Sequence, residues 1–480
     1  MSIKTNYIYN VTYQILLLIT PLITTPYISR VLGAELIGIH SYCYSIATYF
    51  VLFIMLGVAN YGNRSTARSR NDKKELSKIF SSIYATQMIR GVIVSILYYL
   101  YVLFFVSSYK TIALVNGIYV ISAVFDISWF FFGLEQFKLT VTRNIVIKIL
   151  SVISIILFVN DDSDLVLYSL IIVLSAFITN IYLWIFVFKH VSVFRVSWSD
   201  MSKHIIPELL LFIPIIAVSL YKILDKIMLG LMTTPDEVGF FTSSESIVSI
   251  PLSIVTALGP VMLPRISYLI ANGEVEESQR YIGVSIQFSV MLSSAFAFGL
   301  VAISTNFVPV FFGDGFDPCI VLLKGMPFTI ILISWANVIR TQYLIPNDAD
   351  KEYIVSVVIG AFINVLMNLL LIRQLGSIGA MLSTITAESV VCIIQTKAVW
   401  GLLPIKEYIR DSIKYIIFGL IMAAGVSYIP QIIGNGLSAL ICQLFVGGLI
   451  YSALVCIILY KSKDNALVEI IRVVTKRGNK

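Results

Sequence analysis

The chain alternates between long apolar runs and short polar segments. Each apolar run holds the roughly 20 residues that a helix needs to cross the hydrocarbon core of a membrane. The pattern therefore predicts fourteen membrane-spanning helices, and an even number places both chain ends on one side. The predicted spans are residues 9–32, 37–61, 80–107, 111–134, 144–160, 165–188, 207–232, 238–262, 282–304, 320–345, 354–372, 378–400, 413–430 and 438–459.

The composition excludes a water-soluble globule. Of the 480 residues, 58% are hydrophobic and only 13% are charged, whereas soluble domains carry roughly a quarter charged residues. The cysteines form no Cys-x-x-Cys pair and fall mostly inside apolar runs, which favours packing over disulfide or metal roles. The first apolar run lacks a small-residue cleavage site, so we expect a retained first helix rather than a signal peptide.

The basic residues predict the orientation of the chain. The net charge is +7, with 34 Lys and Arg residues. Of these, 27 fall at the chain ends and in the even-numbered loops, while acidic residues gather in odd loops near 161–164, 236–237 and 314–317. Because short cytoplasmic loops collect Lys and Arg, we expect both termini in the cytoplasm. The charge is thus an orientation signal, and no nucleic-acid partner is expected.

The sequence carries no recognisable catalytic machinery. The predicted loops do not exceed roughly 20 residues, which is too short for a folded soluble domain. There is no Gly-Lys dipeptide and hence no Walker A phosphate loop, and the histidines form no metal-binding motif. We therefore expect no catalytic residues and no metal site. These observations favour a carrier over a membrane polymerase or acyltransferase.

A weak internal repeat relates the first two spans to the seventh and eighth. The separation between Ser45 and Arg64 recurs between Ser246 and Arg265, and Ile-Ser-Trp occurs at both 127–129 and 333–335. Chance matches between apolar segments remain an alternative. The repeat predicts two parallel six-helix lobes, residues 1–200 and 201–405. Residues 406–480 would add two helices and a basic tail.

Two ionisable residues are predicted at equal depth on adjacent spans. Arg90 lies in the third span and Asp126 in the fourth, each about 18 residues from the turn near residue 108. A buried ion pair that holds the two helices together is the interpretation we favour. A functional role for the same two residues is the alternative.

A second group of charges lies in the seventh and eighth spans. Lys222, Asp225 and Lys226 are spaced i, i+3, i+4, which places them on one helix face. Glu245, across the following turn, is expected at a depth similar to that of Lys226. We favour a cavity role for this patch, although four mutually neutralising charges could also be structural. Arg and Lys in a cavity suit an anionic head group, because their donors can share phosphate oxygens.

Three further ionisable residues are candidates for transport. Glu388 lies deep in the twelfth span without an evident local partner, so it could couple transport to H⁺ or Na⁺, or serve as a hydrogen-bonded structural acid. Arg30 and Arg340 lie near the outer and inner ends of their spans and are candidates to line the two mouths. No other cofactor is expected.

Two stretches of the chain resemble a known family. Residues 126–144 (DISWFFFGLEQFKLTVTRN) look like the signature of the bacterial Wzx-type polysaccharide flippases, which belong to the multidrug/oligosaccharidyl-lipid/polysaccharide (MOP) exporter superfamily. Residues 225–230, 238–241 and 261–265 are similar to the seventh and eighth helices of that family. Phe241 replaces the tyrosine that is common there.

The resemblance implies both an architecture and an activity. It implies two six-helix lobes in a V-shaped, MATE-like arrangement in the bacterial inner membrane. A cationic central cavity would move undecaprenyl-pyrophosphate-linked oligosaccharides from the inner to the outer leaflet, for capsule or O-antigen assembly. Expected partners are membrane lipids and a polysaccharide polymerase with other assembly components, and the carrier itself is expected to be a monomer. The implied motif positions are Asp126, Trp129, Gly133, Glu135, Asp225, Lys226, Gly230 and Gly239.

Two related transporters remain alternatives. A MATE-like drug/cation antiporter would share the architecture, but we expect such a protein to expose acids rather than Arg and Lys in its cavity. A lipid II flippase would carry a similar anionic lipid head group and is harder to distinguish from the residues.

Overall fold

The computed structural model describes residues 3–192 and 194–462. For residues 3–15, 17, 213, 214, 217, 220–222, 459, 461 and 462 it describes only the backbone. Every regular element among the described residues is helical, as the apolar runs predict. Eleven of the helices found there are long and apolar enough to cross a membrane, so the protein is a multi-pass, all-α membrane protein.

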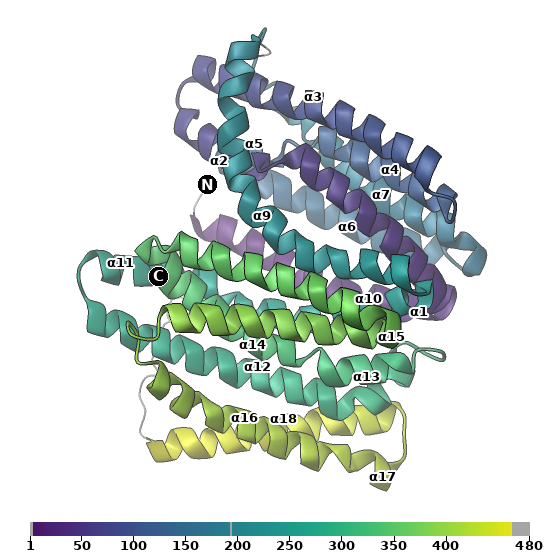
Figure 1. Cartoon of the computed structure of the whole chain (residues 1–480), viewed down its shortest axis with the longest axis vertical. Coiled ribbons are helices and arrows are strands. Elements are labelled where there is room, and N and C mark those ends of the chain that lie inside the picture. The colour runs from purple at the N-terminus through teal and green to yellow at the C-terminus, as the bar shows by residue number, and fades with distance from the viewer. Residues whose placement is uncertain (1–2, 193, 463–480) are drawn as a thin grey trace. The chain divides into compact units, whose positions relative to one another are not determined.

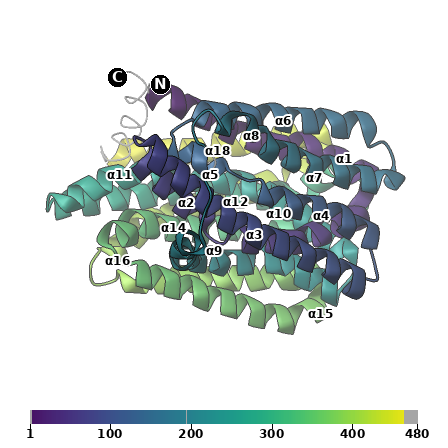
Figure 2. The ribbon, with the colours of Figure 1, turned by 90° about the horizontal axis from the view of Figure 1, so that it is seen from above.

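The chain divides into two compact units, Met1–Gly239 and Phe240–Lys480. In the first unit, α3, α4, α6 and α7 lie alongside one another (Figure 1), and α1 runs beside α6 (Figure 2). The bounds are α1 Ile3–Met55, α2 Val58–Ser69, α3 Lys73–Phe105, α4 Lys110–Val124, α5 Ser128–Gly133, α6 Phe137–Phe158, η1 Asp162–Asp164, α7 Leu165–Tyr182, α8 Trp184–Val187 and α9 Trp198–Met232. Helix α10, Pro235–Thr256, crosses the division.

In the second unit, α12 packs against α14, α16 and α18. The bounds are α11 Leu258–Ala271, α12 Val275–Phe311, α13 Pro318–Gly325, α14 Phe328–Ile339, η2 Arg340–Leu344, η3 Ile345–Asn347, α15 Asp350–Ala398, α16 Ile405–Ser427, α17 Ile429–Ile433 and α18 Leu437–Ser462. The η2 segment is a π-helical turn, a local widening of the helix that is frequent at functional sites.

Glycines mark two of the predicted breaks between spans. Helix α1 bends at Gly33, with φ 71° and ψ 177°, and α15 bends at Gly376, with φ 54° and ψ −132°. Both conformations are sterically unfavourable for a residue with a Cβ atom. Each bend separates two predicted spans that are otherwise continuous helix. Each of the bent helices α1 and α15 counts once among the eleven candidates but holds two predicted spans, and α9 is not among the eleven. The count of fourteen crossings therefore stays a prediction.

Helix α9 begins nine residues before the span predicted there. Ser197 and Asp200 form a capping box, in which the Ser197 side chain accepts a hydrogen bond from the Asp200 N–H and Asp200 returns one to the Ser197 N–H. The helix packs against α1, α2 and α3. The first compact unit therefore extends to Gly239, beyond the lobe boundary predicted after residue 200. Whether residues 1–200, 201–405 and 406–480 act as separate transport lobes stays a prediction.

Candidate functional site

A buried ion pair joins α3 to α9. Arg90 Nη1 lies 2.5 Å from Glu208 Oε2, and Arg90 Nε donates to the Ile54 carbonyl of α1 at 3.3 Å. The Glu208 side chain is fully buried, and that of Arg90 is 19% exposed. The predicted pairing of Arg90 with Asp126 is therefore wrong. Glu208 provides the carboxylate instead, from a helix more than 100 residues away in sequence.

This pair leaves polar atoms buried without a hydrogen bond. Arg90 Nη2 and Glu208 Oε1 have no hydrogen-bond partner among the described residues. A charged group that is removed from water without full compensation is costly. The pair is thus an embedded charged site with unused donor and acceptor capacity.

Asp126 has a local structural role. Its Oδ1 accepts a hydrogen bond from the Ser128 N–H at 2.9 Å, and its backbone carbonyl accepts one from Gln87 Nε2 at 2.9 Å. Trp129 Nε1 in turn donates to Gln87 Oε1 at 3.1 Å. Because the Trp129 side chain is buried in the aromatic core of the first unit, this part of the motif holds the start of α5 against α3.

The end of the same motif forms a corner with α2. A Cβ added at Gly133 would lie 2.5 Å from Thr66 Cβ and 2.7 Å from the Asn63 carbonyl oxygen, so only glycine permits this approach. Glu135 adopts φ 59°, and its Oε1 lies 2.6 Å from Arg70 Nη1 in an exposed ion pair. Gly133 and Glu135 therefore shape the connection between α2 and α5.

The seventh-span motif combines charge with close packing. Asp225 is 2% exposed and Lys226 is half-buried, and each interacts with other groups. The Lys222 side chain lies outside the described residues, so its predicted place on the same face stays a prediction. Gly230 packs directly against the Tyr42 ring and Gly239 against the Ala34 carbonyl. These two glycines allow α9 and α10 to approach α1 closely.

Arg30 and Arg340 each donate a hydrogen bond to a residue three or four positions earlier in the chain. Arg30 is exposed and donates from Nη1 to the Pro26 carbonyl at 2.7 Å. Arg340 Nη2 donates to Asn337 Oδ1 at 2.5 Å, and its guanidinium lies 5.4 Å from the centre of the Tyr353 ring. Arg340 begins the π-helical turn η2. That they line the two mouths of a cavity stays a prediction.

The acids predicted for ion coupling differ in solvent exposure. Glu388 is 6% exposed on the second half of α15, and Glu245 is half-buried on α10. Both interact with other groups. Their roles, like those of the other predicted cavity residues, stay predictions.

Sequence reasoning missed three buried polar residues. Glu208 was overlooked because the seventh span was predicted to begin at residue 207, which places Glu208 at the rim of the span. The Ser197-x-x-Asp200 capping pattern signals that the helix begins earlier. Arg143 is 5% exposed and donates from Nη1 to the Thr179 carbonyl at 2.7 Å. Gln87 is fully buried. A single glutamine in an apolar run gave no signal of its partners.

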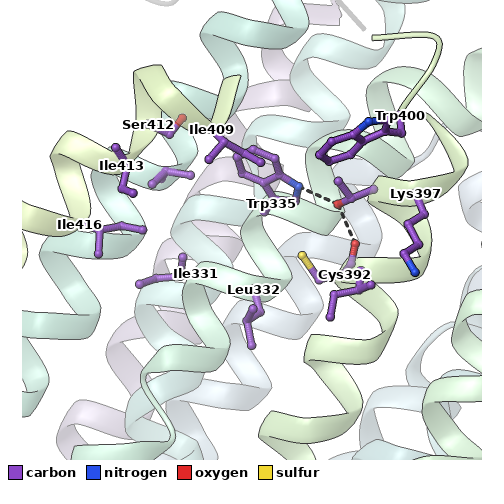
Figure 3. A pocket seen from close by; sticks show the side chains of 13 residues that line it. Ile331, Leu332, Trp335, Cys392, Lys397, Trp400, Ile409, Ser412, Ile413 and Ile416 are labelled. Atoms are coloured by element: carbon purple, nitrogen blue, oxygen red, sulfur yellow. Dashed lines mark hydrogen bonds between the residues drawn. The ribbon is translucent and has the colours of Figure 1, made fainter. Parts of the chain in front are cut away.

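An apolar groove of about 390 Å³ lies in the second unit between α12, α14, α15 and α16. In Figure 3, Ile409, Ile413 and Ile416 lie on one side, Trp400 and Lys397 on the other, and Trp335 between them. Trp335 Nε1 donates to Thr396 Oγ1 at 3.0 Å. The groove thus offers mainly apolar contacts.

The repeated Ile-Ser-Trp triplets occupy different settings. Trp335 lies inside α14 and lines this groove, whereas Trp129 lies at the start of the short helix α5 and is 2% exposed. The two triplets therefore have different local surroundings, and the internal repeat stays a prediction.

Comparison with known proteins finds relatives whose names state an activity. A protein of Escherichia coli (strain K12), whose name describes an O-antigen transporter, is 23% identical over 82% of this chain and 95% of its own. A protein of Haloferax volcanii, whose name describes a low-salt glycan biosynthesis flippase, is 22% identical over 53% of this chain and 54% of its own.

Solved structures share the fold. The lipid II flippase MurJ in an inward closed conformation superposes with a TM-score of 0.78, at 14% identity, over 95% of this chain and 99% of its own. An inward-facing MATE multidrug transporter of the MOP superfamily superposes with a TM-score of 0.62, at 12% identity, over 83% of this chain and 96% of its own. At such identities these matches establish the fold alone.

The match to a family model covers more than half of the chain. The model described as polysaccharide biosynthesis protein matches residues 3–270. This range holds both motifs noted in the sequence, the α2–α5 corner and the Arg90–Glu208 pair. The chain therefore belongs to the polysaccharide biosynthesis protein family.

Proposed function

We propose that the protein is a flippase that moves lipid-linked oligosaccharides across the bacterial cell membrane for surface-polysaccharide assembly. The observation that carries this proposal is the likeness, along 82% of the chain, to a protein named as an O-antigen transporter. The family match over residues 3–270 supports it. The embedded cations Arg90 and Lys226 suit an anionic lipid head group.

The finer parts of the proposal follow from charge. An undecaprenyl-pyrophosphate linkage carries about two negative charges, and an inside-negative potential favours its outward movement by about 2.3 kcal/mol per charge per 100 mV. Flipping from the inner to the outer leaflet could then proceed by alternating access without ATP. The carrier would work as a monomer in the inner membrane, with both termini cytoplasmic, and deliver its substrate to a polymerase and other assembly components.

The lipid II flippase activity is a second candidate, favoured by the fold shared with MurJ at a TM-score of 0.78. Both activities require cationic side chains that bind a pyrophosphate, and their substrates differ in the attached sugar. Parallel flipping assays with an oligosaccharide-linked lipid and with lipid II distinguish them. A MATE-like cation antiporter is less well supported, because the relatives with stated activities handle glycans.

Replacing Lys226 tests the cavity assignment. In proteoliposomes, Lys226→Ala should slow flipping by about tenfold or more, since a hydrogen bond to a charged group is worth about 1.5–3 kcal/mol. Lys226→Arg, which keeps the charge, is the matched control and should retain most activity. Normal flipping by Lys226→Ala, with normal surface polysaccharide in cells, would remove Lys226 from the cavity. Lys222→Ala is expected to act in the same direction.

Coupling to H⁺ or Na⁺ is proposed for Asp225, Glu245 and Glu388, because carboxylates at membrane depth are the groups that can exchange such ions. Flipping by the reconstituted protein should then respond to one of the two gradients. If imposed H⁺ and Na⁺ gradients both leave the rate unchanged, ion coupling is excluded.

A further inference from the structure

A second cavity lies on the flank of the first unit, between α6 and α7. It has a volume of about 710 Å³ and is lined by side chains of the α5–α6 turn, α6 and α7. The two helices pack against each other and lie side by side in Figure 1. We call this cavity the α6–α7 groove.

The groove has a polar end. Lys138 and Thr142 are exposed there, one helical turn apart on the same face of α6. Arg143 also lines the groove, with only 5% of its surface exposed. Both cationic side chains line the groove, and the positive-inside pattern places this end at the cytoplasmic surface.

The Arg143 guanidinium is held rigidly. Its Nε and Nη2 donate to Asn144 Oδ1 at 3.0 and 2.8 Å, and its Nη1 donates to the Thr179 carbonyl at 2.7 Å. These hydrogen bonds orient the guanidinium. A pre-positioned guanidinium loses little conformational entropy when it binds an anion.

Glu135 is the acid among the groove-lining residues, and its charge is already matched. Its Oε1 lies 2.6 Å from Arg70 Nη1. Lys138 forms no ion pair within the described part of the chain. Lys138 therefore leaves a positive charge at the polar end of the groove, complementary to an anion.

The rest of the groove is apolar and long. Val146 and Ile178 are 49% and 53% exposed, and Ile147 also lines the groove. From Lys138 to Ile147, α6 rises by about 14 Å at 1.5 Å per residue. One leaflet of the hydrocarbon core is about 15 Å deep. The groove, its polar end included, thus spans about the depth of the cytoplasmic leaflet.

We propose that the α6–α7 groove binds an anionic phospholipid of the cytoplasmic leaflet. The phosphate contacts Lys138 and Arg143, and an acyl chain lies along Val146, Ile147 and Ile178. Basic pockets between membrane helices on the cytoplasmic side are suited to anionic lipid heads. This site is independent of the carried substrate, because its lining residues do not include Arg90 or Lys226.

Native mass spectrometry of the full-length protein tests the site. The protein is titrated with phosphatidylglycerol and with phosphatidylcholine of the same acyl chains. We expect one phosphatidylglycerol to bind more tightly than phosphatidylcholine. Lys138→Gln should weaken that binding about fivefold, which corresponds to about 1 kcal/mol for a basic residue near an anionic lipid. Val146→Trp should fill the apolar part and abolish the bound lipid.

Lys406→Gln is the matched control, because Lys406 is an exposed lysine outside this groove that undergoes the same change of charge. It should bind phosphatidylglycerol as the unmodified protein does. The proposal is overturned if the protein shows no preference for phosphatidylglycerol, or if Lys138→Gln behaves like Lys406→Gln. Displacement of phosphatidylglycerol by a polyprenyl phosphate, one for one, would also overturn it and assign the groove to the substrate.

Discussion

The carboxylate of Glu208 is fully buried, and Arg90 reaches it from another helix. Removing one partner from such a pair leaves the other charge uncompensated, which usually costs about 3–5 kcal/mol. Arg90 retains 19% exposure, so water relieves part of that cost. The pair therefore joins α3 to α9 and places one positive and one negative charge inside the first unit.

We predict that Glu208→Gln lowers the free energy of unfolding by about 3 kcal/mol, the lower end of the range for breaking a buried pair. Thermal unfolding of the purified protein in detergent measures the change. The double variant Arg90→Met/Glu208→Met should recover part of the loss, since it removes both charges. An unchanged melting temperature for Glu208→Gln would contradict the pairing.

Double-mutant cycles distinguish the pair in the structure from the pair predicted by depth. Arg90→Gln and Glu208→Gln should be strongly non-additive, because the two side chains are in contact. Arg90→Gln and Asp126→Asn should be additive, because Asp126 bonds locally to Ser128. The opposite pattern would favour the Arg90–Asp126 pair.

His204 joins three helices near the start of α9. Its Nδ1 lies 2.8 Å from Tyr61 Oη of α2, and its Nε2 lies 2.8 Å from Ser82 Oγ of α3. Burial lowers the pKa of His204, and the nearby Lys203 lowers it further. The folded protein thus prefers a neutral imidazole at this junction.

The lowered pKa makes stability depend on pH. Between the lowered folded pKa and the unfolded pKa of about 6.5, the unfolded chain binds more protons, so stability falls as pH drops through this window. His204→Gln should reduce the loss of melting temperature between neutral and mildly acidic pH. His190 has a pKa lowered by burial, Lys189 and Lys73, so part of the dependence should remain. An identical pH profile in His204→Gln would contradict the assignment.

At the level of elements, contact between α2 and α5 depends on a glycine. A Cβ added at Gly62 would lie 2.5 Å from Trp129 Cε3, and Trp129 is fixed by Gln87 and buried. The indole cannot move aside without breaking that hydrogen bond. The first family motif is therefore a packing device that places α5 against α2 and α3.

We predict that Gly62→Ala destabilises the protein by about 1–3 kcal/mol through overpacking. Gly448→Ala is the matched control, because no atom lies within 4 Å of the added Cβ and the residue lies inside α18. There the change should be neutral or stabilising by up to about 1 kcal/mol. Thermal unfolding in detergent compares the two, and equal effects would argue against a tight α2–α5 contact.

At the level of the whole molecule, two compact units share one chain, and α9 belongs to the first. The orientation of the chain in the membrane is predicted from the distribution of basic residues, which is a property of the sequence. It predicts the α2–α3 turn in the cytoplasm and the α6–α7 turn outside. The exposed residues Asn71 and Ser163 lie in these two turns.

Cysteine labelling in intact cells checks this orientation. In a background without the native cysteines, Ser163→Cys should react with a membrane-impermeant maleimide. Asn71→Cys should react only after the membrane is permeabilised. The reverse reactivity would place both termini outside, and reaction of both sites in intact cells would contradict an alternating topology.

The sequence by itself determined the membrane-spanning helical character, because a run of apolar residues is a local property that any tertiary arrangement must satisfy. It also predicted the breaks between spans within which α1 bends at Gly33 and α15 bends at Gly376, and it supplied the motifs that resemble the family. It could not supply the partner of Arg90. Asp126 is the acid at the predicted depth of Arg90, whereas Glu208 falls at the rim of its predicted span. Only the packing of α9 on α3 brings Glu208 within 2.5 Å of Arg90.

The α6–α7 groove likewise needed the tertiary structure. Lys138 and Arg143 are visible in the sequence as two of many basic residues in cytoplasmic loops. Their meeting with Ile178 in one cavity depends on how α6 and α7 pack. Hydrophobic periodicity reports which residues avoid water, whereas the choice between chemically similar partners is made by contacts between segments distant in sequence.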